Sequence, residues 1–226
     1  MTATASTGKI SFTGWDKVVQ TWRQRFERTP SSPATSWGGD VVLNLVNTVT
    51  ARNAEPVDWL DGYARLLDWA ELAGAFPAAD LAHLRSETVA HPRTAAHALT
   101  RVQELRETIW ELLTAIVTGQ SPPPGALVGL QTHWRTAIAH ASLRPLDEHI
   151  ATVLPVEASG LDYLTHALAL HAVRLLGDVS LSRLRVCAGR QCGWFYLDTS
   201  KAGRRRWCDM ATCGNAEKTR RHRARP

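Results

Sequence analysis

All four cysteines of this 226-residue chain lie in its last 40 residues, in the spacing C-x4-C-x15-C-x4-C. The first pair is Cys187 and Cys192, and the second pair is Cys208 and Cys213. Two close pairs of thiols, separated by a span long enough for a hairpin, allow four thiolates to converge tetrahedrally on one Zn²⁺. Four thiolates leave no open coordination position, so the spacing predicts one structural zinc ion rather than a catalytic one.

Two other chemistries for these cysteines stay open, an iron–sulfur cluster and free or redox-active thiols. An iron–sulfur cluster also takes four cysteines, but its usual spacings differ from this one. The chain shows no secretion signal, so we expect a reduced, cytoplasmic setting in which clustered thiols bind metal more readily than they form disulfides. No run of about 20 apolar residues is present, which predicts that no membrane is a partner.

Positive charge is concentrated around the cysteines. Residues 183–226 carry twelve Lys and Arg against three Asp and Glu, a net charge of +9, whereas the whole chain has +5. The preceding part of the chain is therefore net acidic. A basic C-terminal segment of this kind indicates a polyanion as its partner. The candidate contacts to phosphates or bases are Arg204, Arg205, Arg206, Lys218, Arg220, Arg221, Arg223 and Arg225.

The residues between and after the cysteines predict a small finger. Trp194–Leu197 is strongly β-prone, turn residues follow, and Arg204–Trp207 can return as the second strand of a hairpin. Gly214 permits a sharp turn, and Asn215 can cap a helix with Glu217 in its first turn. A knuckle, a hairpin and a helix around one zinc form a treble-clef-like finger, which buries too little apolar area to fold without its metal.

Helical periodicity dominates the chain before the cysteines, so the predicted fold class is mainly α with minor β. We expect an N-terminal extension (1–38) with an amphipathic helix at 10–26, a mostly helical domain (39–180) and the finger (181–226). Within the middle domain the pattern predicts helices over 41–46 capped by Asp40, 60–72, 80–89 capped by Asp80, 94–117, 127–141 and 161–176, a stiff proline-rich connector over 121–125, and a hairpin over 143–154. The charged positions of the longest helix, Arg101, Glu104, Arg106, Glu107 and Glu111, are expected to form a solvated face.

Two amides in the first helix of this domain are candidate ligand contacts. Asn44 and Asn47 lie three residues apart, which places both on one side of a helix with Thr48 and Arg52 close by. The alternative interpretation is that the two amides satisfy backbone groups of a neighbouring loop. The scattered histidines form no cluster, and no nucleophile or acid–base constellation is visible, so we predict no catalytic residue and no enzyme.

The segment from Cys187 to Asn215 resembles the CGNR zinc-finger family, through its Cys-Gly-Trp-Phe-Tyr, Arg-Arg-Arg-Trp-Cys and Cys-Gly-Asn runs. The upstream run Leu45-Val46-Asn47-Thr48 is similar to the opening signature of the ABATE domain, and Leu66-Leu67-x-Trp69 with Ala73-Gly74 is similar to its downstream part. In that family, bacterial proteins regarded as stress-induced transcription regulators carry a helix-rich ABATE domain before the finger. Ala216 stands where the family has Arg. The resemblance therefore implies that this chain lacks any nucleic-acid contact that the family's Arg makes.

Charge and resemblance together predict a zinc-dependent DNA-binding transcription regulator, responsive to a ligand or to stress through its N-terminal domain. One alternative is an RNA-binding finger, with exposed Trp194, Phe195 or Tyr196 stacking on unpaired bases. The other is a metabolite-binding or small enzymatic domain that uses the finger for docking. The sequence leaves open a small-molecule effector and a homodimer.

Overall fold

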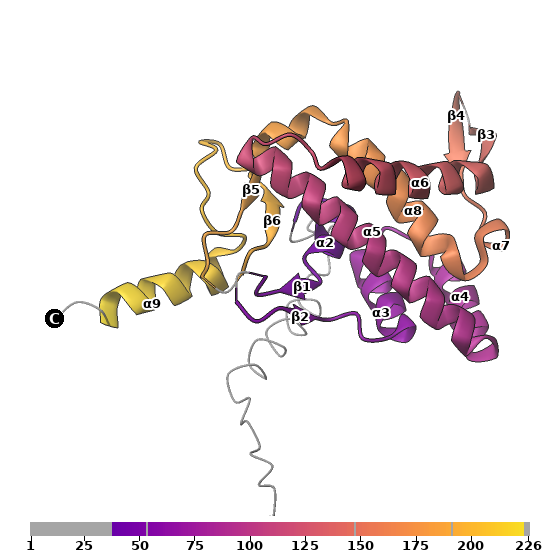
Figure 1. Ribbon diagram of the computed structural model, residues 1–226, viewed down its shortest axis with the longest axis horizontal. Coiled ribbons are helices and arrows are strands. Elements are labelled where there is room, and N and C mark those ends of the chain that lie inside the picture. The colour runs from indigo at the N-terminus through magenta and orange to yellow at the C-terminus, as the bar shows by residue number, and fades with distance from the viewer. Residues whose placement is uncertain (1–37, 53, 147, 191, 224–226) are drawn as a thin grey trace, which may run out of the picture. The chain divides into compact units, whose positions relative to one another are not determined.

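The computed structural model describes residues 38–52, 54–146, 148–190 and 192–223, and Figure 1 gives their arrangement. Residues 36–226 form one compact unit by their internal contacts. The expected amphipathic helix at 10–26 lies outside the described residues. We call residues 39–180 the helical region and residues 181–226 the finger.

The described part of the chain is mainly helical with three small antiparallel strand pairs, as the sequence predicts. The helices are α2 (Val41–Val46), α3 (Tyr63–Ala73), α4 (Ala78–Ala90), α5 (Pro92–Thr118), α6 (Pro124–His140), α7 (Val156–Ser159), α8 (Tyr163–Leu176) and α9 (Asn215–Arg223). Shorter turns are η1 (Gly160–Asp162), η2 (Val179–Arg183) and the π-helical turn η3 (Met210–Gly214). The strand pairs are β1 (Val49–Thr50) with β2 (Val57–Asp58), β3 (Ser142–Leu146) with β4 (His149–Val153), and β5 (Leu184–Val186) with β6 (Phe195–Leu197). None of the helices described here is both long and apolar enough to cross a membrane.

The long helix α5 lies at the centre of the helical region, with α6 and α8 beside it (Figure 1). Its residues Val102, Leu105 and Ile109 are fully buried, which is the apolar stripe that the three-and-four spacing predicts. Gly74 and Gly119 end α3 and α5 in the left-handed conformation, with φ of 64° and 67°. A residue with a Cβ is strained in this conformation, so both glycines act as the predicted helix stops.

Helix α2 forms from an almost wholly apolar run because Asp40 caps it. The Asp40 carboxylate accepts a hydrogen bond from the backbone N–H of Val42 at 2.8 Å, which satisfies one of the free donors at the helix start. All residues of α2 except Asn44 are buried. The choice of helix over strand for this run is therefore confirmed.

The expected starts of α3, α4 and α6 were wrong. Helix α3 begins at Tyr63 and not at Leu60. Asp80 lies in the first turn of α4 rather than at its cap, which is occupied by Pro77. Helix α6 begins at Pro124, so the last part of the predicted proline-rich connector is helical. Proline suits this place because the first turn of a helix needs no backbone N–H donor and favours the fixed φ of the ring.

The prediction that Arg106 belongs to a solvated face was also wrong. Arg106 is only 3% exposed, and its guanidinium donates to both carboxylate oxygens of Asp58 on β2 at 2.7 and 2.6 Å. It also donates to the Thr48 hydroxyl at 3.1 Å and to Glu107 at 2.9 Å. These bonds hold the β1–β2 pair against α5, because a buried guanidinium must find partners for its donors.

Glu107 extends this network to the segment after β1. Arg52 donates to both of its carboxylate oxygens, at 2.6 and 3.0 Å, and stacks over the ring of Trp110 with 5.0 Å to the centroid. Burial acts to raise the pKa of Glu107, but the guanidinium groups of Arg52 and Arg106 lower it below its ordinary value overall. Glu107 is therefore held as a carboxylate between two arginines.

Replacing Arg106 is expected to destabilise the protein more than replacing a surface arginine. Arg106→Leu removes the guanidinium bonds to Thr48 and to Asp58, which is partly exposed and keeps the N–H of Leu60 as a donor, so the expected cost is about 2 kcal/mol, as for a hydrogen bond to a charged group. The matched control is Arg85→Leu, because Arg85 pairs with Asp68 and Glu71 at the surface, where such pairs contribute below about 1 kcal/mol. Urea unfolding followed by circular dichroism measures both changes. Equal losses in the two variants would contradict the role of Arg106.

Candidate metal centre

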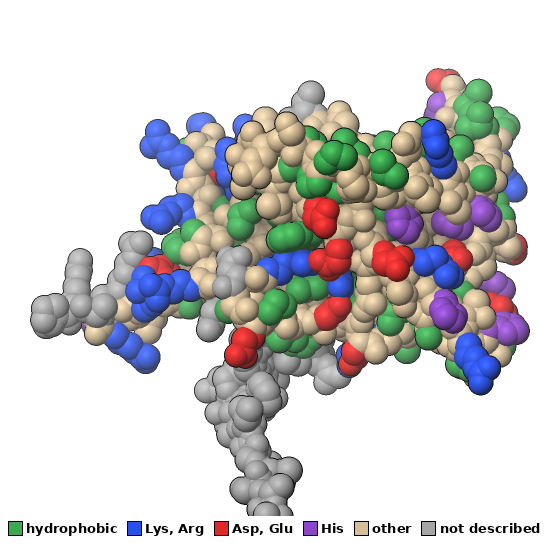
Figure 2. Space-filling model, viewed as in Figure 1, with side chains coloured by type: hydrophobic (Ala, Val, Ile, Leu, Met, Phe, Trp, Pro, Cys, Tyr) green, Lys and Arg blue, Asp and Glu red, His purple; other side chains and the backbone are tan. Residues whose placement is uncertain are grey.

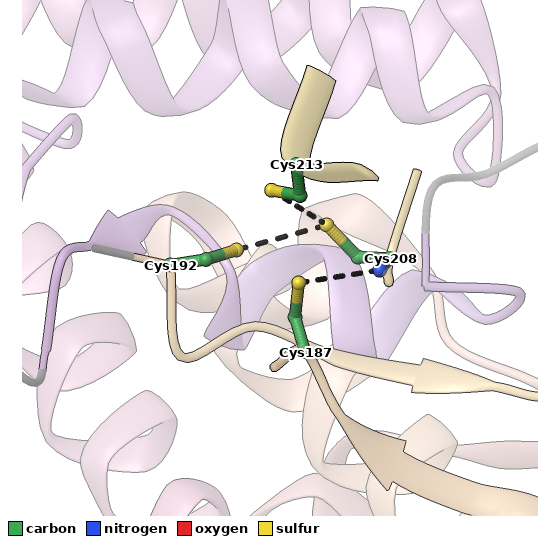
Figure 3. Close-up of side chains that lie close together, drawn as sticks. All are labelled: Cys187, Cys192, Cys208 and Cys213. Atoms are coloured by element: carbon green, nitrogen blue, oxygen red, sulfur yellow. Dashed lines mark hydrogen bonds between the residues drawn. The ribbon is translucent and has the colours of Figure 1, made fainter. Parts of the chain in front are cut away.

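The four sulfur atoms of Cys187, Cys192, Cys208 and Cys213 lie within 4.8 Å of one another (Figure 3). Cys208 Sγ is 3.6 Å from Cys192 Sγ and 3.7 Å from Cys213 Sγ. A tetrahedral zinc ion with Zn–S bonds of about 2.3 Å sets its sulfurs about 3.8 Å apart. None of the four cysteines forms a disulfide. The cluster therefore fits one structural Zn²⁺, as the cysteine spacing predicts.

The first cysteine pair lies in the tight loop between β5 and β6. Cys187 follows β5 directly, and its N–H donates to the carbonyl of Trp194 at 2.8 Å, while the N–H of Cys192 donates to Gly189 at 3.1 Å. A Cβ on Gly189 would lie 3.1 Å from the Cβ of Cys192 and 3.5 Å from the sulfur of Cys187. Gly189 thus lets the loop close tightly around the metal position.

The second pair is brought in by a capped turn. The backbone N–H of Cys208 donates to the sulfur of Cys187 at 3.3 Å, which ties the two pairs together. Cys213 lies in η3, whose start is capped by Asp209: this carboxylate accepts from the backbone N–H of Thr212 at 3.0 Å and from its hydroxyl at 2.8 Å. Hydrogen bonds from backbone N–H groups to sulfur, such as the one from Cys208 to Cys187, stabilise thiolate ligands.

The four thiols are close enough to hydrogen-bond one another, which lowers the pKa of Cys187 and Cys213 and raises the pKa of Cys192 and Cys208. Hydrogen bonds from the thiols of Cys192, Cys208 and Cys213, together with the N–H of Cys208, lower the pKa of Cys187. A lowered pKa favours the thiolate, which is the form that binds metal.

The prediction that Trp194–Leu197 forms a hairpin with Arg204–Trp207 was wrong. Strand β6 pairs with β5, which precedes the first cysteine, and not with Arg204–Trp207. The latter segment instead makes single contacts: the carbonyl of Arg206 accepts from the N–H of Ala188 at 2.9 Å, and that of Arg205 accepts from the Tyr196 hydroxyl. The β5–β6 hairpin therefore encloses the first cysteine loop. The prediction that Asn215 caps the start of the last helix was also wrong, because Asn215 is the first helical residue of α9 and has helical backbone angles.

A buried acid that the sequence did not single out braces the turn after β6. The two oxygens of Asp198 accept from the N–H of Ser200 at 3.0 Å, its hydroxyl at 2.6 Å and the N–H of Arg205 at 2.9 Å. The bonds from Ser200 in particular lower the pKa of Asp198. The pKa of Asp198 is thus lower in the folded protein than in the unfolded chain. Its carboxylate stabilises the finger at pH values above the unfolded pKa, and this stabilisation is lost as the pH falls through the folded pKa.

The predicted nucleic-acid contacts fall into two groups. Arg204, Arg206, Lys218 and Arg223 are exposed. Arg205 and Arg220 are engaged within the chain: Arg205 donates to the carbonyls of Trp207 and Cys208 and stacks over Tyr196, and Arg220 pairs with Glu217. Arg225 and the side chain of Arg221 lie outside the part that the structure describes. Nucleic-acid contact by these residues stays a prediction.

The candidate ligand group in the helical region is occupied by internal bonds. The Asn47 amide bonds the backbone of Phe195, and the Asn44 oxygen accepts from the N–H of Gly38 at 3.0 Å. The hydroxyl of Thr48 donates to the carbonyl of Leu45, and Arg52 pairs with Glu107. Both amides thus satisfy backbone groups, which is the alternative that the sequence left open. Ligand binding by this group stays a prediction.

A helical region followed by a four-cysteine finger defines the class of protein: a zinc-finger protein with a helical N-terminal domain. Residues 39–179 match the family model ABATE, described as a putative stress-induced transcription regulator, and residues 183–226 match the CGNR zinc finger. The ABATE match spans more than half of the chain, so the protein belongs to the ABATE family and ends in a CGNR zinc finger. No curated protein matches the chain.

The purified protein is expected to hold one zinc per chain, and Cys208→Ser is expected to lose it. Cys208 lies at the middle of the cluster, with its sulfur next to two others, so its loss removes one of four ligands and an oxygen replaces a favoured sulfur. Lys201→Ser is the control, because it places a serine on an exposed residue of the same finger. Mass-spectrometric metal analysis measures the zinc content. A Cys208→Ser protein with full zinc would contradict the four-thiolate site.

Proposed function

We propose that this protein is a zinc-dependent DNA-binding transcription regulator in which the zinc centre holds a cationic loop and helix against the nucleic acid. The observation that carries the proposal is the exposure of helix α9. All of its residues with described side chains are exposed except Glu217, and the helix has no apolar face to bury in this chain.

The charge of α9 supports an anionic partner. A helix of nine residues is marginally stable by itself in water, and like charges three and four residues apart destabilise it further. The described cations Lys218, Arg220 and Arg223 are partly offset by Glu217 alone. A phosphate backbone laid along the helix would relieve this repulsion and release counterions.

The loop that leads to the second cysteine pair adds a second group of cations. Lys201, Arg204 and Arg206 are exposed, and the Arg206 guanidinium lies 5.5 Å from the ring centroid of Trp207. In Figure 2 most charged side chains over the finger and α9 are Lys and Arg, whereas over the helical region Asp and Glu lie among Lys, Arg and His. This separation of charge supports an orientation in which the finger, and not the helical region, meets the polyanion.

Duplex DNA is favoured over single-stranded RNA because the three aromatic side chains that were candidates for stacking on bases are buried. Trp194, Phe195 and Tyr196 are 6%, 2% and 1% exposed. Recognition of unpaired bases uses exposed aromatic rings as stacking platforms. Their burial removes the feature on which the RNA alternative depended, and it leaves phosphate and groove contacts by cations and polar side chains.

DNA affinity is expected to fall with salt at a slope of roughly −5 in log K against log salt, if about six cations neutralise phosphates. Lys218→Ala and Arg223→Ala should each weaken binding and reduce the slope by about 1. Arg93→Ala is the control, because Arg93 is exposed on α5 in the helical region. Fluorescence anisotropy with a DNA duplex over a salt series measures these values. A slope near zero, or tighter binding to structured RNA in competition, would contradict the proposal.

Ala216→Arg, which supplies the residue that the family carries, is expected to strengthen DNA binding. Ala216 is exposed in the first turn of α9, so a longer side chain meets no packed neighbour there. One added phosphate contact should steepen the salt slope by about 1. Ala216→Gln is the matched control, with a long polar side chain that lacks the charge. An unchanged slope in Ala216→Arg would place this face of α9 away from the DNA.

A further inference from the structure

Strand β6 of the finger is joined to the helical region by one side chain. The amide nitrogen of Asn47 donates to the carbonyl of Phe195 at 2.8 Å, and the backbone N–H of Phe195 donates to the amide oxygen of Asn47 at 2.9 Å. Both residues are buried, at 3% and 2% exposure. The two bonds satisfy both backbone groups of Phe195, as a neighbouring strand would.

These bonds complete the second edge of β6. On its first edge β6 pairs with β5, and on its second the N–H of Leu197 donates to the carbonyl of Gly38 at 2.9 Å. The side chains of Phe195 and Leu184 belong to the same apolar core as helices α2, α5 and α8. The hairpin of the finger is therefore part of the core of the helical region and not a separately packed module.

The route from Asn47 to the metal position is short. Phe195 lies three residues after Cys192, and the carbonyl of the intervening Trp194 accepts from the N–H of Cys187. The first cysteine pair therefore lies in the loop that joins β5 to β6, and Asn47 bonds the strand at which this loop ends. A displacement of Phe195 would move both Cys187 and Cys192 relative to the second pair.

We propose that Asn47 is a positioning residue for the zinc centre. It holds the hairpin whose loop carries the first cysteine pair in the geometry that zinc requires, and it thereby links metal binding to the folding of the helical region. This inference is independent of nucleic-acid binding. By thermodynamic linkage, zinc must then stabilise the helical region, and the intact contact must raise the affinity for zinc.

Asn47→Ala tests the first half of this link in the full-length protein. The variant leaves two buried backbone groups of Phe195 unpaired, and supporting contacts around metal ligands change affinity by roughly 10- to 100-fold. We expect at least about a tenfold loss of zinc affinity in competition with a chelator, and altered d–d bands when Co²⁺ replaces zinc. Asp40→Ala is the control, because it removes the cap of the same helix without touching the finger.

The control separates positioning from general destabilisation. Asp40→Ala should lower the unfolding temperature while its zinc affinity and Co²⁺ spectrum stay as in the wild type. If Asn47→Ala also keeps the wild-type zinc affinity and spectrum, Asn47 is only a packing residue and the proposal is overturned.

The wild-type protein tests the second half of the link, and it needs no variant that folds. Removing zinc with a chelator should lower the thermal midpoint of the helical signal at 222 nm by at least about 4 °C, because zinc binds the folded state only. If the midpoint of the helical signal is the same with and without zinc, the helical region folds independently of the metal and the proposal is overturned.

Discussion

The hydrogen-bonding requirement of one buried strand decides how this protein is joined together. Strand β6 has only three residues, it is buried from Phe195 to Tyr196, and its backbone groups must find partners on both edges. Strand β5 supplies one edge, and the backbone of Gly38 with the side chain of Asn47 supplies the other. Because an amide side chain takes the place of a strand, the hairpin of the finger packs directly against the helical region. The metal centre follows from this arrangement, since its first two thiols are at the end of the same hairpin.

Charge burial imposes a second constraint, in the helical region. Arg106 lies on the core side of α5, four residues after Val102 and three before Ile109, and it can be buried only because Asp58, Thr48 and Glu107 meet its donors. The short β1–β2 pair brings Asp58 to this place. The segment from α2 to β2 therefore has two tasks: its Asn47 faces the finger and its Thr48 faces Arg106, so adjacent residues bond opposite parts of the structure.

The sequence predicted what depends on local spacing. The spacing of the four cysteines identifies them as the zinc ligands. Gly74 and Gly119 end their helices because glycine readily adopts the left-handed conformation. Contacts between distant segments were missed. The partner of Asn47 is 148 residues away, so the sequence left open whether its amide contacts a ligand or satisfies backbone groups. The β-prone run Trp194–Leu197 was paired with Arg204–Trp207, the next segment along the chain, because local propensity does not identify the partner of a strand. Arg106 is a different case. Its charge suggested a solvated side chain, but its position between Val102 and Ile109 places it on the buried stripe of α5.

Two parts of the finger are stabilised in different ways. Apolar burial of Phe195 and Leu184 in the common core stabilises the hairpin, whereas the loop beyond it, from Asp198 to Cys213, depends on local polar contacts and on the metal. Helix α9 has neither, since it starts after the last cysteine and presents polar side chains on almost all sides. A segment that the core and the metal leave exposed, and that carries net positive charge, is free to adapt to a partner at little cost to the fold. Cations that contact other parts of the chain, such as Arg205 over Tyr196, stabilise the fold, and the proposed function depends on the exposed cations of α9 and of the loop before Cys208.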